Sequence, residues 1–200
     1  MLEIRRKLIH ASGILTIFLI LWLGKWAAAA IILSLAILSF IVSRYRKDKK
    51  KYKIIKSKKL DEFEESIENV VKNHERPNTE PFKGVAEFFL GCFFATLLFE
   101  PRIAMASIAV LSLADATSTL IGKHYGKHRL PLNKDKTVEG SVSFFITATV
   151  ALLFFVSPPS AVMTALIATF VEMIPKVDDN ITIPIAVGMV LSTLKLFILS

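Results

Sequence analysis

Cysteine is almost absent from this chain of 200 residues, which contains only Cys92. An intrachain disulfide is therefore impossible, and nothing in the cysteine content indicates an oxidising compartment. The four histidines form no grouping with Cys92 of the kind that a structural zinc site requires. Disulfide scaffolds and zinc modules are thus excluded as the basis of the fold.

Two common sequence signals are also missing. No GxxxxGK[ST] motif follows a strand, so the chain has no P-loop. The first apolar run follows Arg5, Arg6 and Lys7, but no small-residue cleavage site ends it and a second apolar run comes directly after it. We therefore expect the first run to be retained rather than removed as a signal peptide.

Apolar residues are abundant and come in long blocks. They make up 53% of the chain, which has 15 phenylalanines and a mean hydropathy of +0.54. A membrane-spanning helix needs about 20 mostly apolar residues, within a range of about 17 to 25. The segments that approach this length are 8–24, 26–43, 84–99, 102–121, 141–157, 160–174 and 181–199. The sequence therefore predicts an all-α, polytopic integral membrane protein with about seven transmembrane helices, in which residues 1–200 form one membrane-embedded catalytic domain.

Lysine and arginine are distributed unevenly between the predicted loops. The seven-span prediction puts 22 of the 25 on one side and leaves Lys25, Arg102 and Lys195 on the other. Because basic loops favour the cytoplasm, the N-terminus is predicted to be cytoplasmic and the C-terminus to lie outside. This distribution accounts for the net charge of +8 without a nucleic-acid partner.

The longest loop, residues 44–83, is predicted to be a basic and amphipathic cytoplasmic insertion. It begins with the basic stretch RYRKDKKKYKIIKSKK and turns acidic at LDEFEESIE. Apolar residues then recur at helical spacing, at Leu60, Phe63, Ile67, Val70 and Val71. We expect an amphipathic helix at about 54–73, with its basic half against anionic headgroups.

Three acidic residues, Glu87, Asp115 and Glu172, fall inside predicted spans. A charged side chain at the centre of a spanning helix costs roughly 2.5 to 3.5 kcal/mol on insertion scales, so each should face protein, water or a bound ion. On a helix, Asp115 shares one face with Ser118, Thr119 and Gly122. Asp115 is therefore the strongest candidate for a functional acid within the predicted spans.

The face that carries Asp115 leads into a stretch rich in glycine and basic residues. Gly122 and Gly126 permit close backbone approach, and the cations that follow Asp115 are Lys123, Lys127, Arg129, Lys134 and Lys136. Mg²⁺ prefers carboxylate oxygens and keeps substrate phosphates among its ligands, while lysines act as point charges toward phosphates. The pattern predicts a site for Mg²⁺ and a nucleoside triphosphate at the membrane surface, with Ser118, Lys123, Gly126 and Lys127 among its binding residues.

Three segments resemble the signature of the CTP-dependent lipid kinases, the group of dolichol kinase, phytol kinase and yeast-type diacylglycerol kinase. LADATSTLIGKHYGKHRLPLNKDKTVEGS resembles their central motif, an Asp followed by glycines, a basic turn and Lys-Thr-x-Glu-Gly. RRKLIHASG is similar to their Arg-Lys-x-x-His element, and VEMIPKVDDNITIPI to their pattern of Glu, Asp-Asn and Pro. One difference is Ala114, where family members often have glycine before the Asp.

The resemblance implies one site at the cytoplasmic face, built from all three segments. Catalytic roles are implied for Asp115, Lys136, Asp179 and His10, and Asp179 is preferred over Asp178 and His10 as the base for the lipid hydroxyl. The implied Mg²⁺ ligands are Asp115, Glu139, Glu172 and Asp179. The implied nucleotide-binding residues are Arg6, Lys7, Gly122, Thr137, Glu139, Gly140 and Asn180.

The implied reaction is transfer of the γ-phosphate of CTP to the hydroxyl of a membrane isoprenoid alcohol, of the dolichol, polyprenol, phytol or geranylgeraniol type, or of diacylglycerol. Two alternatives remain open at this point. A CDP-lipid synthase shares the Asp, the Gly-Lys turns and Lys-Thr-x-Glu-Gly, and an ion-coupled transporter would also explain the acids in the predicted spans. A homo-oligomer is compatible with the sequence.

Overall fold

The computed structural model describes residues 7, 10–47, 83–174 and 178–199. Arg6 and the amphipathic helix predicted at 54–73 lie outside these residues. Within them every regular element is a helix, loops connect the helices, and one isolated bridge pairs Arg129 with Thr137. The helices are α2 (Thr16–Lys47), α4 (Lys83–Leu98), α5 (Pro101–Ala109), α6 (Asp115–Tyr125), α7 (Val138–Leu153), α8 (Pro158–Met173) and α9 (Asp179–Leu199). The predicted all-α class is thereby confirmed.

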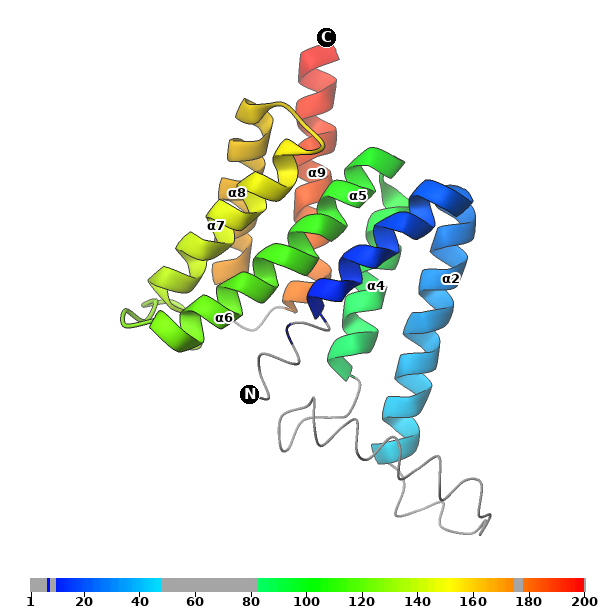
Figure 1. The fold of residues 1–200 in the computed structure, drawn as a ribbon, viewed down its shortest axis with the longest axis horizontal. Coiled ribbons are helices and arrows are strands. Elements are labelled where there is room, and N and C mark those ends of the chain that lie inside the picture. The colour runs from blue at the N-terminus through cyan, green and yellow to red at the C-terminus, as the bar shows by residue number, and fades with distance from the viewer. Residues whose placement is uncertain (1–6, 8–9, 48–82, 175–177, 200) are drawn as a thin grey trace.

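The longest helix, α2, is interrupted at Gly24. This residue has φ 78° and ψ 168°, a backbone conformation that glycine adopts without the steric cost of a Cβ. Figure 1 shows the chain turning back at this point, so that α2 consists of two arms. The break coincides with the boundary predicted between segments 8–24 and 26–43. A short 3₁₀ turn, Gly13–Leu15, precedes the first arm.

The centre of the bundle is one continuous helical path over residues 101–125. It consists of α5, a π-helical turn at Val110–Ala114, and α6. Of its apolar window 72% is buried, against 28% for the apolar windows of His10–Arg44 and Asp179–Leu196. The path packs against α4, α7 and α9, and Asp115 is the first residue after the π turn. Single π turns inside α-helices occur frequently at functional sites, which makes this position notable.

Among the residues that the structure describes, three helices are long and apolar enough to cross a membrane: His10–Arg44, Pro101–Tyr125 and Asp179–Leu196. Helices α7 and α8 are apolar but shorter. Large apolar side chains such as Trp22, Phe154 and Leu196 are exposed on the outside of the bundle, as expected where lipid replaces water. The predicted count of seven spans and the predicted orientation remain predictions.

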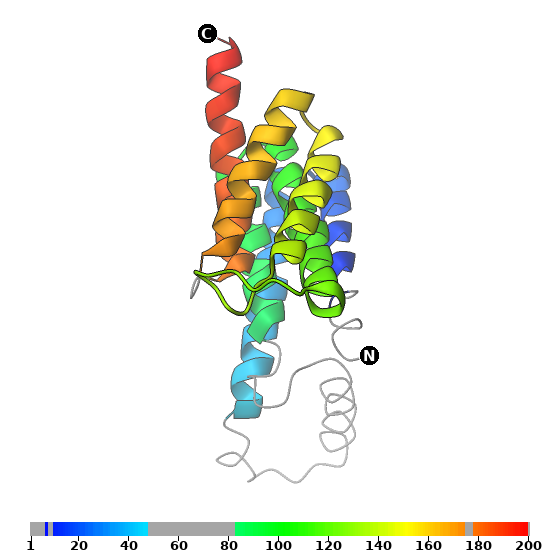
Figure 2. The same ribbon diagram turned by 90° about the vertical axis from the view of Figure 1, so that its left-hand side faces the viewer.

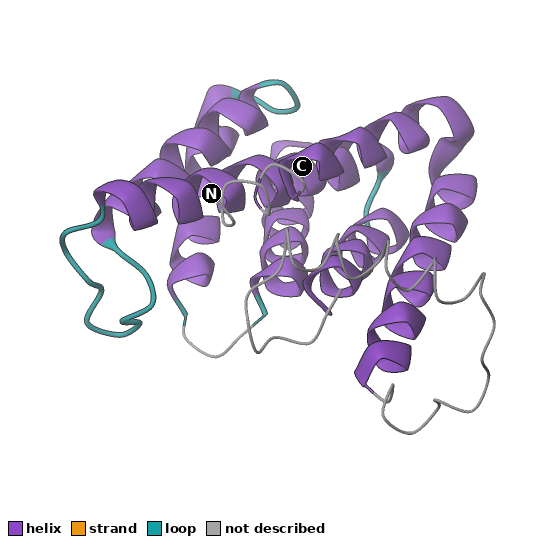
Figure 3. Cartoon of the chain, turned by 60° about the horizontal axis from the view of Figure 1, so that its bottom comes forward, coloured by secondary structure: helices purple, strands orange, loops and turns teal. Residues whose placement is uncertain are grey.

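Segments far apart in the sequence meet at one end of the bundle. Helices α6 and α7 pack together, as do α7 with α8 and α8 with α9. Figures 1 and 2 show that the end of α6, the start of α7, the end of α8 and the start of α9 all lie at this end. Figure 3 views the bundle with this end brought forward, and the loop between α6 and α7 projects from it. The central and the last motif segments of the sequence therefore meet at the same end.

Candidate active site

The loop between α6 and α7 is folded back on itself and ends at Lys136. The backbone N–H of Leu130 donates to the carbonyl of Lys136 at 3.1 Å, and that of Val138 to the carbonyl of His128 at 2.9 Å. Asn133 is 9% exposed, and its carbonyl accepts from the N–H of Lys136 at 3.0 Å. Its side-chain oxygen accepts from the N–H of Asp135 at 3.2 Å. The backbone of Lys136 is thus fixed on both sides.

The ammonium group of Lys136 lies between two carboxylates from other helices. Its Nζ is 2.7 Å from Oε1 of Glu172, in the last turn of α8, and 2.6 Å from Oδ2 of Asp179, the first residue of α9. Burial of the lysine opposes its charge, but the two carboxylates outweigh burial and raise its pKa above the usual value. Lys136 therefore stays protonated and joins the loop, α8 and α9.

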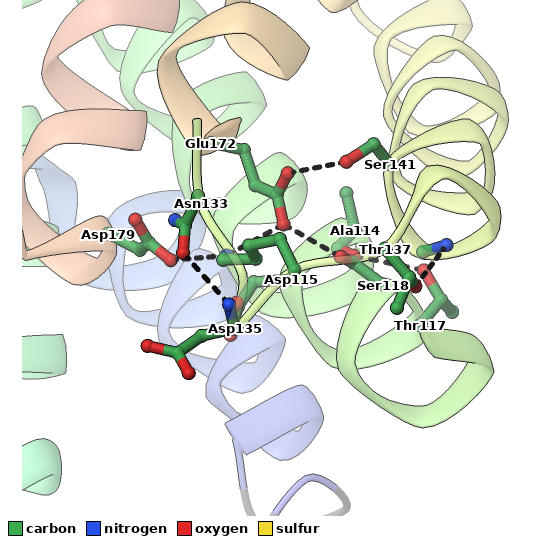
Figure 4. A network of polar contacts seen from close by, with 12 residues as sticks. Ala114, Asp115, Thr117, Ser118, Asn133, Asp135, Thr137, Ser141, Glu172 and Asp179 are labelled. Carbon is green, nitrogen blue, oxygen red and sulfur yellow. Dashed lines mark hydrogen bonds and ion pairs between the residues drawn. The ribbon is translucent and has the colours of Figure 1, made fainter. Parts of the chain in front are cut away.

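Glu172 is fully buried, and both of its carboxylate oxygens accept hydrogen bonds. Oε1 accepts from Ser118 of α6 at 2.8 Å as well as from Lys136, and Oε2 accepts from Ser141 of α7 at 3.1 Å. Figure 4 shows the contacts from the carboxylate of Glu172 to both serines. Sequence reasoning missed Ser141, although it directly follows Gly140 at the end of the motif. Its place in the first turn of α7, beside the predicted site, was the available signal.

Asp115 is only 5% exposed and is compensated by the N-terminal segment. The Nζ of Lys7 is 2.5 Å from its Oδ2, and Nε2 of His10 is 3.3 Å from the same oxygen. The ring of His10 also packs edge-on against Phe88 of α4, with 4.6 Å between the ring centroids. The basic element at the start of the chain therefore reaches the acid of the central motif, as the resemblance implied.

Helix α6 connects the group around Asp115 with the group around Lys136 and Glu172. Ser118 lies one turn after Asp115 on the same helix and donates to Glu172. The structure thus brings together seven predicted site residues: Lys7, His10, Asp115, Ser118, Lys136, Glu172 and Asp179.

The predicted glycines and Thr137 pack α6 against α7. A Cβ on Gly122 would lie 2.9 Å from Oγ1 of Thr137, and one on Gly126 would lie 2.6 Å from the Thr137 methyl group. A Cβ on Gly140 would lie 2.9 Å from the carbonyl of Ser118. Thr137 is the N-cap of α7, and its hydroxyl accepts from the N–H of Gly140 at 3.1 Å. These residues hold the two helices close together beside the charged groups.

Other predicted site residues make their contacts outside this set of charged groups. The carboxylate of Glu139 contacts His128, with 2.7 Å between Oε1 and Nδ1. A hydrogen bond from its own backbone N–H and the contact with His128 lower the pKa of Glu139 to about 2. Lys123 and Lys127 are exposed, and the backbone N–H of Asn180 donates to Asp178 at 2.9 Å.

No ready-made metal cage is present in the part of the chain that the structure describes. There, no three His, Cys, Asp or Glu side chains come close enough together to hold a metal ion on their own. Asp115 and Asp179 instead face lysine ammonium groups. The arrangement can bind a ligand that brings both a cation and anionic groups, because the acids suit the former and the lysines suit the latter.

Comparison with known proteins identifies relatives of two kinds. The chain is 31% identical over 131 residues to a probable chloroplastic phytol kinase 2 of Glycine max, an alignment that covers 56% of this chain and 45% of the relative. It is 25% identical over 123 residues to the CTP-dependent diacylglycerol kinase 1 of Schizosaccharomyces pombe, covering 52% of this chain and 56% of that enzyme. The chain spans about half the length of these kinases.

A third relative matches over almost the entire length. An uncharacterized protein of Methanocaldococcus jannaschii is 30% identical over 200 residues, which cover 96% of this chain and 94% of the relative. No protein-family model matches the chain, and no solved structure matches it significantly.

Proposed function

Because the chain belongs to the CTP-dependent lipid kinase family, we propose that it transfers the γ-phosphate of CTP to the hydroxyl of a membrane lipid alcohol. The proposed acceptor is an isoprenoid alcohol of the dolichol, polyprenol, phytol or geranylgeraniol type, or diacylglycerol. The reaction takes place on the cytoplasmic face, and Mg²⁺ enters with the nucleotide. The observation that carries this proposal is a set of ion pairs between the motif segments. Asp115 pairs with Lys7, and Lys136 pairs with Glu172 and Asp179. Residues of all three motif segments therefore contribute to one site.

The relatives support the two substrates separately. The fission yeast relative is named as CTP-dependent, which supports CTP as the phosphate donor. The plant relatives are named as phytol kinases, which supports an isoprenoid alcohol as the acceptor. An isoprenoid alcohol remains in the bilayer while CTP is in water, so the site must be reachable from both. A cluster at the end of an apolar helical bundle meets this requirement.

Phosphoryl transfer depends on positioning and on neutralising the charge of the phosphate groups. In our proposal Lys7 and Lys136 supply the positive charge that neutralises the phosphates, because both ammonium groups lie at the cluster. Mg²⁺ is usually held by one or two carboxylates together with substrate phosphates, so the absence of a three-acid group among the described residues does not conflict with it. Asp115 and Asp179 are the acids that we assign to the metal that accompanies CTP.

The sequence resemblance implied that Glu172 is a ligand of Mg²⁺, and we propose a different role for it. Its oxygens already accept from Ser118, Lys136 and Ser141, and its side chain is fully buried. A group in this state is better suited to fixing other side chains than to exchanging ligands. We therefore assign it the positioning of Lys136 against the phosphates.

Asp179 is also the proposed base. Its side chain is 23% exposed, whereas those of Asp115 and Glu172 are 7% and 0% exposed, so a lipid hydroxyl reaches Asp179 most easily. In the proposed step the hydroxyl oxygen forms a bond to the γ-phosphorus and its proton passes to Asp179. The bond from the γ-phosphorus to the bridging oxygen breaks, and CDP leaves with that oxygen.

The test is a screen of purified protein with Mg²⁺, four nucleotides and two panels of acceptors, one of lipid alcohols and one of lipid phosphates, with the products identified by mass. We expect a lipid monophosphate and CDP, formed from CTP in preference to ATP, GTP or UTP. Pyrophosphate and a CDP-lipid, formed from a lipid phosphate, would instead identify a CDP-lipid synthase. Ion flux in liposomes without any nucleotide, and no lipid product, would identify a transporter.

A further inference from the structure

A cavity of about 390 Å³ lies at the end of the bundle away from Lys136. It is bounded by the start of α5, the turn between α7 and α8, and the last part of α9. Figures 1 and 2 show these segments at the opposite end from the loop that carries Lys136. The proposed kinase reaction uses none of these residues.

The inner wall of the cavity is apolar. Ile103 and Leu191 are 7% and 3% exposed, and Phe155 and Leu194 are half-buried beside them. An apolar wall of this kind is a favourable contact for a hydrocarbon chain but offers nothing to a small hydrated ion.

The outer part of the cavity is polar and carries more positive than negative charge. Arg102 and Lys195 are its two cations and Glu100 is its one acid, and all three are exposed. The carboxylate of Glu100 is 2.7 Å from Nζ of Lys195, so the acid is engaged by one cation and one positive charge is left in excess. Arg102 lies in the first turn of α5, where the backbone N–H groups of the helix start add positive potential. An anionic group is therefore the complementary partner.

The position of the charges along the helices indicates the source of that anion. The candidate span Pro101–Tyr125 begins beside Arg102, and the candidate span Asp179–Leu196 ends beside Lys195. The ends of spans lie at the level of the lipid headgroups. A cation at this level beside an apolar wall matches a phospholipid, whose phosphate and acyl chains have the same order along the membrane normal.

We propose that this cavity binds one anionic phospholipid from the leaflet opposite the Lys136 cluster. The lipid phosphate lies against Arg102 and Lys195, and the upper part of one acyl chain packs on Leu191, Leu194 and Phe155. The site is separate from the proposed kinase reaction and depends only on the helices crossing a membrane.

The test compares lipid retention by wild type, Arg102→Gln and a matched control, Lys25→Gln. Lys25 lies on the same predicted side of the membrane but beside Trp26 of α2, and it does not line the cavity. Each protein is reconstituted with an equal mixture of phosphatidylglycerol and phosphatidylcholine and then extracted. The retained lipid is measured by native mass spectrometry, and unfolding temperatures confirm that all three proteins are folded.

We expect wild type and Lys25→Gln to retain phosphatidylglycerol in preference to phosphatidylcholine. Arg102→Gln should retain about fivefold less phosphatidylglycerol, because one cation near the headgroups contributes about that factor to the binding of an anionic lipid. Equal retention by all three proteins, or no preference for the anionic lipid, would overturn the proposal. A third arm adds inorganic phosphate. If phosphate alone protected wild type against unfolding as well as the lipid did, the cavity would be a simple anion site and the proposal would be wrong.

Discussion

Lys136, in the loop before α7, and Glu172, in the last turn of α8, are 36 residues apart in the sequence and 2.7 Å apart in the structure. Asp179 of α9 lies 2.6 Å from the same ammonium group. One lysine therefore ties a loop to two helices at the point where the proposed chemistry takes place. Stability and activity should both depend on it.

Replacing Lys136 with Gln should remove activity and weaken the fold. Removing one partner of a buried ion pair costs about 3 to 5 kcal/mol, and partial exposure of Lys136 puts the expected loss near the lower value. Phosphate transfer should fall by about 100-fold or more, the loss typical of a charged group that acts on the transition state. The control is Lys83→Gln, which removes an exposed lysine, and it should change neither the unfolding midpoint nor turnover appreciably. Equal effects of the two substitutions would contradict the assigned role.

The coupling between Lys136 and Glu172 can be measured directly with a double-mutant cycle of Gln substitutions. We expect a coupling free energy of about 1 to 3 kcal/mol from reversible unfolding in mixed micelles, because the two groups are in contact. A second cycle pairs Lys136 with Glu139, whose carboxylate contacts His128 instead. That cycle should give a value within about 0.5 kcal/mol of zero. A strong coupling between Lys136 and Glu139 would contradict the pairing of Glu139 with His128.

Gly91 should be intolerant of even a methyl group. A Cβ on this residue would lie 1.9 Å from the carbonyl oxygen of Asn180, so Gly91→Ala must displace the start of α9 and with it Asp179. We expect a loss of about 1 to 3 kcal/mol in unfolding free energy, together with reduced turnover.

The control is Gly84→Ala on the same helix, where a Cβ would meet no atom within 4 Å. It should be neutral or should stabilise the protein by up to about 1 kcal/mol, because alanine favours a helix over glycine. If Gly91→Ala kept the wild-type unfolding midpoint, the close approach of α4 and α9 would be disproved.

Removal of Mg²⁺ should abolish turnover without unfolding the protein. In the structure the acids are compensated by Lys7 and Lys136, so chelation by EDTA should leave the unfolding temperature of the nucleotide-free protein unchanged. CTP at 100 times its dissociation constant should stabilise the protein by about 2.7 kcal/mol, but only when Mg²⁺ is present. Unfolding caused by EDTA alone would indicate a resident structural metal.

Much of the fold could be predicted from hydropathy, because long apolar blocks separated by charged or glycine-containing turns form helices connected by loops when they lie in a membrane. The predicted segments 84–99, 141–157 and 181–199 correspond closely to α4, α7 and α9. The break at Gly24 falls at the predicted boundary between segments 8–24 and 26–43, where Gly24 and Lys25 separate two apolar runs. The π turn before Asp115 was not predicted, because no residue type specifies it.

The candidate site was predicted as a group of residues but not as a set of contacts. The spacing of Asp115 and Ser118 correctly put them near one another, and the resemblance joined them to Lys7, Lys136 and Asp179. Which lysine pairs with which acid depends on the packing of four helix ends, and sequence periodicity carries no information about it. The cap role of Thr137 and the contact between Glu139 and His128 arise from the loop conformation, which likewise could not be predicted.

The most direct test of the proposed kinase activity follows the two ends of the triphosphate separately. Wild type and Asp115→Asn are incubated with Mg²⁺, a lipid alcohol and CTP labelled at either the α- or the γ-phosphorus. We predict that wild type moves only the γ-label into the lipid and leaves the α-label in CDP, and that Asp115→Asn moves neither label above background. Transfer of the α-label to lipid, or undiminished transfer of the γ-label by Asp115→Asn, would contradict the proposed reaction and the role of its central acid.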